Sequence, residues 1–496
     1  MIEKFNLLSL VPEMVLVCMA ILIAMIDLSV KSPRRTTTYV LTVLTMCVVA
    51  ALQAHDAMEG LTVYSFNNMV VSDPMGNWLK CFSTLAVLVT LIYGRPYAAD
   101  RNMLTNGGEL FTLGLFATLG MYVMISGNNF VVLYLGVELL ALSSYALVAL
   151  HRDDTKAAEA AMKYFILGAL GSGFLLYGMS MLYGATGSLD ITAVFKAVSA
   201  GQINHQVLVL GLVFVACGLG FKFGVVPFHM WVPDVYHGAP TVITLMIGGA
   251  HKLAGFAMSI RLLVEGLMPL AIDWQQMLMV MSIASLLIGN LVGIAQTNLK
   301  RLIAYSTISQ MGFVLIGLMS GVVNGDTSAA ANAYSSAMFY VVTYVLTTLA
   351  VFGVIMVLAR KGFESEEITD LAGLNQRSPM FAGIMAVCMF SLAGVPPLVG
   401  FSAKLSVLQA LITSGQPGAV PLAIYAVLMS LFAAYYYLHV VKVMYFDEPL
   451  TTSAVVVHAD VRIVLLINSG LLLVVGLMPG GLMTLCARAI VSTLGT

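Results

Sequence analysis

The chain has 496 residues, of which 60% are hydrophobic and 9% are charged, and its formal net charge is −1. A soluble domain averages about 25% charged residues, and the surface of a soluble fold needs far more polar side chains than this chain supplies. The composition therefore excludes a soluble protein and indicates that the bilayer is the solvent. The nearly neutral charge gives no reason to expect nucleic acid as a partner.

Apolar runs long enough to cross a bilayer recur along the whole chain. A transmembrane helix needs about 20 mainly apolar residues, and these runs predict about fourteen spans, so we expect an all-α polytopic membrane protein. The predicted spans are 8–28, 37–54, 72–93, 107–126, 128–150, 159–184, 206–232, 240–263, 275–296, 301–321, 331–358, 378–413, 419–446 and 462–486. No remaining segment is long enough for a soluble domain, so residues 1–496 form a single membrane domain.

The first apolar run argues against a cleaved signal peptide, and the cysteines argue against disulfides and a metal site. Glu3, Lys4 and Glu13 flank a first run that is long enough to span, which predicts a retained helix and no cleaved signal peptide. Six cysteines are scattered singly through apolar runs, with no C-x-x-C motif. We therefore expect neither a disulfide framework nor a metal or Fe–S site.

Basic residues are unevenly divided between the two sets of loops. The odd-numbered loops contain thirteen: Lys31, Arg34, Arg35, Arg95, Arg101, Arg152, Lys156, Lys300, Arg301, Arg360, Lys361, Arg377 and Arg462. The opposite side contains only four, Lys4, Lys196, Arg261 and Arg488. Positive residues are retained in the cytoplasm, so the odd loops are predicted to be cytoplasmic and both termini to lie outside the cytoplasm.

Two predicted spans contain helix breaks beside a lysine. Span 7 has Lys222 five residues before Pro227, and span 12 has Pro396 and Pro397 ahead of Gly400 and Lys404. Proline interrupts helical hydrogen bonding, and corresponding broken helices in two halves of a chain are typical of a transport path between repeats. Since five spans separate the breaks, we expect inverted repeats, although two independent proline kinks would also give this pattern. The repeats would cover 107–263 (spans 4–8) and 275–446 (spans 9–13), flanked by 1–93 and 462–496.

Four charged residues lie at bilayer depth. Glu138 is central in span 5 and Lys252 in span 8, while Lys222 and Lys404 lie within spans 7 and 12. Each charge costs about 2.5–3.5 kcal/mol at mid-helix on insertion scales, so these side chains must face the protein interior. A buried ion pair that orients helices is one explanation. The second explanation is a proton relay. It is favoured because three lysines cannot all pair with one glutamate, and because a desolvated lysine releases its proton readily.

Further titratable residues lie in or beside the same spans. Lys163, His229, His251 and His439 are candidates for a proton path, with hydrogen-bonded packing as the alternative for each histidine. Lys80 and Lys442 lie near helix ends, where we expect their ammonium groups to snorkel to the membrane surface.

Several stretches together resemble the proton-pumping, antiporter-like membrane subunits of respiratory complex I, the bacterial NADH:quinone oxidoreductase. They are LYLGVELLALSSYALVAL, EAAMKYFILGALGSGFLLYG, FKFGVVPFHMWVPDVYHGAPT, NLKRLIAYSTISQMGF and FSLAGVPPLVGFSAKL, which extend from span 5 to span 12. Within that family the chain is most similar to the N type. The M type typically has a glutamate where Lys404 stands, and the L type has a long C-terminal lateral helix.

This resemblance implies a function and an assignment of roles. It implies that Glu138 and Lys222 form a coupled pair, that Lys252 is the central relay, and that Lys404 leads toward the outer half-channel. It also implies that this chain contains no cofactor, because NAD, FMN, the Fe–S clusters and the quinone bind to other subunits. The expected partners are the neighbouring M-type and small membrane subunits, lipid and, through the complex, the peripheral NADH-oxidising arm. The expected location is the bacterial inner membrane, with both termini periplasmic.

Two rival functions remain open from the sequence. Subunits of Mrp-type cation/proton antiporters share the same core, and a scaffold subunit without a channel would also be a polytopic membrane protein. The complete set of buried charges argues against the scaffold.

Overall fold

A computed structural model describes residues 6–105, 107–323, 325–450, 455 and 457–495. Glu3 and Lys4, which we used to interpret the N-terminus, lie outside these residues. The described chain is mostly helical, which confirms the predicted fold class. Thirteen of its helical segments are long and apolar enough to cross a membrane. The shorter apolar helices Pro379–Ala393 and Val399–Ser414 together occupy predicted span 12.

The helices follow the predicted spans in order. Their bounds are η2 Leu7–Leu10, α1 Val11–Asp27, α2 Thr36–Glu59, α3 Pro74–Asp100, α4 Glu109–Ser126, α5 Phe130–Val148, α6 Thr155–Thr186, α7 Ile191–Ser199, α8 His205–Phe223, α9 Trp231–Gly238, α10 Thr241–Gly248, α11 Ala250–Ser259, η3 Ile260–Gly266, η4 Met268–Leu270, α12 Ala271–Ile294, α13 Leu299–Met319, α14 Ala330–Leu358, η5 Ile368–Leu371, α15 Leu374–Arg377, α16 Pro379–Ala393, α17 Val399–Ser414, α18 Ala419–Phe446, α19 Ala459–Leu477 and α20 Gly480–Leu494. Strands β1 Val63–Ser65 and β2 Val70–Ser72 form a small antiparallel hairpin, pairing Val63 with Ser72.

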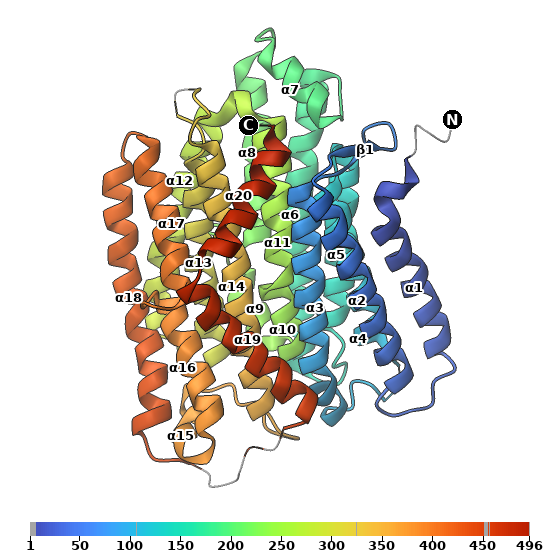
Figure 1. Ribbon diagram of the computed structural model, residues 1–496, viewed down its shortest axis with the longest axis vertical. Helices are drawn as coiled ribbons and strands as arrows, with labels where there is room; N and C mark the ends of the chain where they lie inside the picture. Colours follow the sequence, from blue (N-terminus) through green and yellow to red (C-terminus); the bar gives the residue numbers. More distant parts are fainter. Residues whose placement is uncertain (1–5, 106, 324, 451–454, 456, 496) are drawn as a thin grey trace.

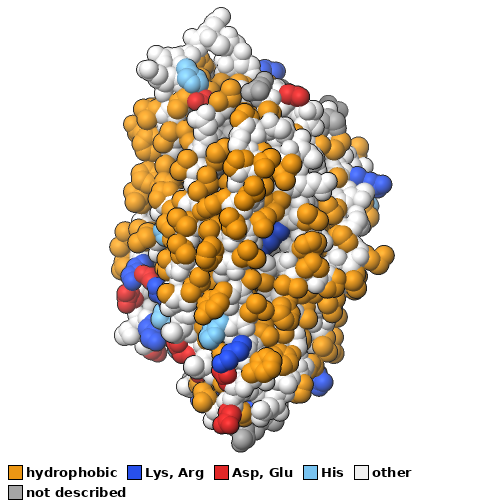
Figure 2. Space-filling model, turned by 90° about the vertical axis from the view of Figure 1, so that its left-hand side faces the viewer, with side chains coloured by type: hydrophobic (Ala, Val, Ile, Leu, Met, Phe, Trp, Pro, Cys, Tyr) orange, Lys and Arg blue, Asp and Glu red, His pale blue; other side chains and the backbone are white. Residues whose placement is uncertain are grey.

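The described ends of the chain lie at the same end of the molecule (Figure 1). The loops around α15 and between α1 and α2 lie at the other end, which we call the basic end. It comprises the segments 28–35, 101–105, 149–154, 295–298 and 359–378. Figure 2 shows hydrophobic side chains over the middle of one face, with charged ones gathered mainly toward the basic end. This distribution fits a protein surrounded by lipid at mid-height.

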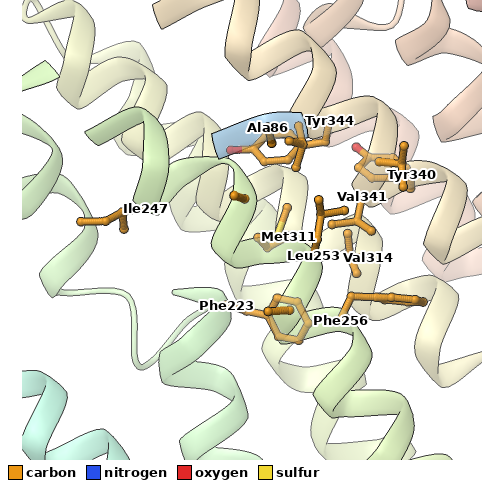
Figure 3. Close-up of a cluster of buried hydrophobic side chains, with 14 of the residues drawn as sticks. Ala86, Phe223, Ile247, Leu253, Phe256, Met311, Val314, Tyr340, Val341 and Tyr344 are labelled. Carbon is orange, nitrogen blue, oxygen red and sulfur yellow. The ribbon is translucent and has the colours of Figure 1, made fainter. Parts of the chain in front are cut away.

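The most buried helices lie in the middle of the bundle. The α10–η3 segment is wholly buried, and α13 and α14 are nearly so, whereas α1, α2, α6, α18 and α19 are largely exposed. Phe223, Leu253, Met311 and Val341 meet in this core from α8, α11, α13 and α14 (Figure 3). The mid-chain helices therefore provide the environment in which a buried charge can be isolated from lipid.

The structure contains both predicted helix breaks. In span 7, α8 ends at Phe223 and α9 begins at Trp231, with Gly224 at φ 70°. In span 12, α16 ends at Ala393 and α17 begins at Val399, with Gly394 at φ 87°. Glycine adopts this left-handed conformation without a Cβ clash, so it ends each half-helix. Each break also contains a cis X-Pro bond, Val226–Pro227 and Pro396–Pro397.

Two further interruptions were not predicted. Span 8 is divided at Gly249 into α10 and α11 and ends in the π-helical turn η3. The last span, predicted as 462–486, is two helices, α19 and α20, which separate at Met478 and Pro479. Proline favours the first turn of a new helix over the interior of an existing one. In Figure 1 these two helices cross the front of the bundle obliquely.

The prediction that Lys80 snorkels is wrong. Its side chain is 1% exposed, and its Nζ lies 2.5 Å from Oε1 of Glu13 on α1. An ion pair with a carboxylate on a neighbouring helix holds a buried ammonium more favourably than apolar surroundings would. The side chain of Lys442 is 58% exposed and pairs with Asp447 at 2.8 Å, which agrees better with the prediction that its ammonium group reaches the surface.

Candidate functional site

Glu138 and Lys222 lie on two different helices and form no direct ion pair. Glu138 lies on α5 and Lys222 in the last turn of α8, and their charges attract each other across the gap. Their charged atoms are nevertheless farther apart than the 4.0 Å of a direct ion pair. Among the described atoms, Oε1 of Glu138 is buried without a hydrogen-bond partner. A small movement of either helix would therefore strengthen or weaken this interaction.

A small cavity adjoins Lys222. Its volume is about 20 Å³, and Tyr145, Tyr164 and Ser172 line it together with Lys222. A cavity of roughly 10–15 Å³ can accept one water if polar partners are present. The hydroxyl groups of this lining are such partners, so the site can hold a water beside the lysine.

Lys252 binds the end of the first half-helix. Its side chain is 1% exposed, and its Nζ donates to the carbonyl oxygens of Phe223 at 2.9 Å and Lys222 at 3.4 Å. The last carbonyls of a helix lack partners within it and carry the negative end of its dipole. The ammonium also lies 5.5 Å from the ring centre of Trp231. Partial charges of the backbone and an aromatic face thus stabilise Lys252.

Lys404 has the same arrangement at the second break. Its Nζ donates to the carbonyl oxygens of Leu392 at 3.0 Å and Ala393 at 3.1 Å, which end α16, and it lies 5.4 Å from the ring centre of Phe313. Within the described residues, neither Lys252 nor Lys404 has a carboxylate within ion-pair distance. An ion pair that orients helices therefore does not account for either lysine.

The remaining candidates fall into different surroundings. His251 precedes Lys252, is 4% exposed, and has a buried Nε2 with no hydrogen-bond partner among the described atoms. His229 lies in the break after α8, and its buried Nδ1 also lacks a partner there. His251 and Lys252 on α11 lie beside the end of α8, since Nζ of Lys252 donates to the backbone carbonyl oxygen of Lys222.

Lys163 and His439 lie apart from this group. Lys163 pairs with Glu159 and Asp234, each at 2.9 Å, and Asp234 also binds Arg301 at 3.0 Å. His439 is exposed on the outer face of α18. Both residues remain predictions as members of a proton path.

A polar network beside Lys404 was not predicted. Gln310 on α13 donates from Nε2 to Leu392 O at 3.1 Å, the carbonyl that Lys404 also binds, and to Tyr437 Oη at 3.2 Å. Tyr340 donates to Oε1 of Gln310, and Tyr437 shares a hydrogen bond with Ser306. Ser306 and Gln310 are four residues apart on one helix, a spacing that places them on the same face. That spacing in the sequence could have revealed the network.

A second buried charge cluster lies at the end opposite the basic end. Arg261, which is 1% exposed, binds Asp73 at 2.7 Å and Glu265 at 2.6 Å and donates to Ile125 O at 3.1 Å. It is therefore a core residue of span 8 and not a loop residue. Over the part of the chain that the structure describes, no three His, Cys, Asp or Glu side chains converge as a metal site would require.

Comparisons with known proteins agree on one group of membrane proteins. Residues 127–432 match the family described as NADH:quinone oxidoreductase/Mrp antiporter, TM. A relative from Polaromonas naphthalenivorans (strain CJ2), named NADH-quinone oxidoreductase subunit N, is 66% identical over 99% of this chain and 98% of its own length. A relative of the same name from Herminiimonas arsenicoxydans is 58% identical over the whole of both chains.

Solved structures show the same fold. A chain of respiratory complex I from Thermus thermophilus with bound aureothin is similar with a TM-score of 0.80 and 28% identity, covering 96% of this chain and 100% of that chain. A chain of the Mrp complex from Dietzia sp. DQ12-45-1b has a TM-score of 0.84 at 19% identity, covering 98% of this chain and 97% of its own. At that identity, the likeness to the Mrp chain concerns the fold alone.

Proposed function

Since this chain belongs to the NADH-quinone oxidoreductase subunit N family, within the wider NADH:quinone oxidoreductase/Mrp antiporter group, we propose that it conducts protons across the membrane as a subunit of that oxidoreductase. The oxidoreductase is an enzyme, and the role proposed for this chain within it is translocation without redox chemistry. The NAD, FMN, Fe–S and quinone sites are assigned to partner subunits. The proposed partners of this chain are the neighbouring antiporter-like and small membrane subunits of the complex.

One observation carries this proposal: two buried lysines bind the carbonyl ends of two broken helices. Lys252 and Lys404 each bind two terminal carbonyls and have no carboxylate partner among the described residues. An amine held this way can be protonated or neutral without losing a salt bridge, as a proton carrier requires. The matching breaks also support two inverted repeats, 107–263 and 275–446, as the framework of the path.

The proposed relay begins at the separated pair. When the Glu138 carboxylate approaches Lys222, it favours the protonated amine, and when it withdraws, it favours proton release. A released proton would pass to Lys252, whose Nζ lies beside Lys222 because it binds the backbone carbonyl of that residue. It would then move through water and the hydroxyl network around Gln310 to Lys404. The cavity of about 10 Å³ beside Lys404 is lined by Gln310, Tyr340, Tyr344 and Ser391. His251 and His229 are proposed as additional proton-binding groups on this path.

The Mrp-type alternative is less well supported. The relatives that match this chain over its full length at 58–66% identity carry the oxidoreductase name, whereas the Mrp chain shares only the fold at 19% identity. The described lysines and the polar network also leave no reason to propose a scaffold without a channel.

The proposal assigns redox chemistry to partner subunits and proton translocation to this chain, and this assignment can be tested directly. We expect the purified chain alone to oxidise no NADH and to bind no flavin, while its deletion abolishes NADH-driven proton uptake in inverted membrane vesicles. Re-expression of the wild-type chain should restore that uptake, which controls for secondary effects of the deletion. NADH oxidation by the isolated chain, or undiminished proton uptake without it, would contradict the proposal.

The proposed location is the bacterial inner membrane, with the basic end in the cytoplasm and both termini in the periplasm. The support is the accumulation of Lys and Arg at the basic end. Single cysteines introduced in segments 31–35 and 360–377 should react with an impermeant thiol reagent in inverted vesicles but not in intact cells. A cysteine introduced near β1 is the control with the opposite expectation. Labelling of either basic-end segment in intact cells would reverse the orientation.

A further inference from the structure

Two adjoining cavities open at the basic end, where α3, α14 and α19 meet. The first has a volume of about 290 Å³ and is lined by the ends of these three helices, including Tyr93, Pro96, Met356, Val357 and Val461. The second, of about 200 Å³, is lined by the segment that follows α14 and by Arg377. Asp100, Val357 and Ala359 line both cavities, so the two adjoin, and we refer to them together as the depression.

The two cavities differ in chemical character. Three cationic side chains, Arg360, Lys361 and Arg377, surround the second cavity, and Asp100 is its one acidic lining residue. Burial and the neighbouring charge of Arg360 lower the pKa of Arg377, whereas Asp370 raises it. Guanidinium and ammonium groups that line one cavity can bind an anionic group such as phosphate through charge-assisted hydrogen bonds.

The first cavity is suited to a hydrocarbon chain. Apolar side chains from the ends of α3, α14 and α19 form part of its wall, among them Pro96, Met356, Val357 and Val461. Tyr97, Asp100 and His458 form a polar part of the same wall. In Figure 1, α19 crosses the front of the bundle obliquely. The first cavity lies where the start of α19 comes near the ends of α3 and α14. A cavity with an apolar side next to a cationic cavity matches a molecule with a charged head and an apolar tail.

We propose that this depression, lined by Arg360, Lys361, Arg377, Met356, Val357 and Val461, binds an anionic phospholipid. The phosphate would lie among the three cations, and an acyl chain would lie along α14 and α19. Basic pockets between helices on the cytoplasmic side recognise anionic lipid headgroups, and each cation near the membrane surface strengthens that attraction. With the basic end in the cytoplasm, as proposed above, the lipid comes from the inner leaflet. A free phosphate would use the cations but would leave the first cavity empty.

The experiment compares lipid retention in two sets of variants of the assembled complex. Complex carrying Arg360→Gln, Lys361→Gln and Arg377→Gln is reconstituted in nanodiscs of phosphatidylglycerol and phosphatidylcholine, and retained lipid is counted by native mass spectrometry. We expect retained phosphatidylglycerol on this chain to fall roughly tenfold or more, with phosphatidylcholine unchanged. Lys31→Gln with Arg34→Gln removes two exposed cations from the same end, outside the depression, and should leave retention as in the wild type.

Each remaining result decides the proposal. Millimolar inorganic phosphate should not displace the phosphatidylglycerol, and displacement would show a free-phosphate site and overturn the lipid assignment. Equal retention in the triple and control variants would also overturn it, as would a neighbouring subunit found covering the depression. If the triple variant fails to assemble, the single variant Lys361→Glu at an exposed position replaces it. Undiminished phosphatidylglycerol retention by that variant would reject the site.

Discussion

Replacement of Lys252 by alanine is expected to lower NADH-driven proton translocation to less than about a tenth of the wild-type value. Only about 1.4 kcal/mol of added barrier is needed for a tenfold loss. The change removes the buried amine and leaves the carbonyls of Phe223 and Lys222 without their donor, and an unsatisfied buried polar group costs about 1–3 kcal/mol. The measurement is ΔpH formation in inverted vesicles, normalised to assembled complex.

Two controls separate lost chemistry from lost packing. Lys252→Met keeps the volume of the side chain but cannot carry a proton, so it should translocate as poorly as the alanine variant. Lys196→Ala removes an exposed lysine in the last turn of α7 and should have no effect. Substantial translocation by the methionine variant would show that Lys252 serves packing alone.

Glu138→Gln is expected to reduce translocation roughly tenfold while leaving assembly intact. The amide keeps the shape of the side chain but removes the charge that acts on Lys222. A carboxylate within reach changes the protonation ratio of a neighbouring amine by about tenfold or more. Since Glu138 makes no ion pair within 4.0 Å with any residue that the structure describes, the substitution breaks no salt bridge among them. Proton uptake and the amount of assembled complex are measured in the same vesicles.

The matched control for this variant is Glu59→Gln. Glu59 is 53% exposed at the end of α2, outside the proposed path, so its loss should change translocation little. Equal behaviour of the two glutamine variants, whether both active or both inactive, would contradict a special role for Glu138.

The number of spans and the helix breaks could be predicted because both depend on local chemistry. Apolar run length determines whether a helix crosses the bilayer, and Pro227, Pro396 and Pro397 interrupt helical hydrogen bonding wherever they occur. The break at Gly249 was missed because its signal, two adjacent glycines in an apolar run, also occurs in uninterrupted membrane helices. The break before Gly480 was missed because the apolar run continues through Pro479.

Side-chain partners could not be predicted in the same way. Lys80 lies near a helix end, where snorkelling is the ordinary outcome, and only the packing of α1 against the neighbouring helices brings Glu13 to it. The carbonyls that bind Lys252 and Lys404 belong to the backbone, whose free ends become visible only once the breaks are located in space. The sequence therefore identified the buried charges but not the groups that stabilise them.

The central claim is that Lys252 carries a proton, and an arginine at this position tests it most directly. Arginine keeps the positive charge and can donate to the same carbonyls, but it does not release its proton in a protein. The measurement is the number of protons translocated per NADH oxidised by assembled complex containing Lys252→Arg. We expect this ratio to be lowered as strongly as in Lys252→Ala. A ratio close to wild type in the arginine variant, with the alanine variant inactive, would show that Lys252 is a fixed counter-charge and would contradict the proposed relay.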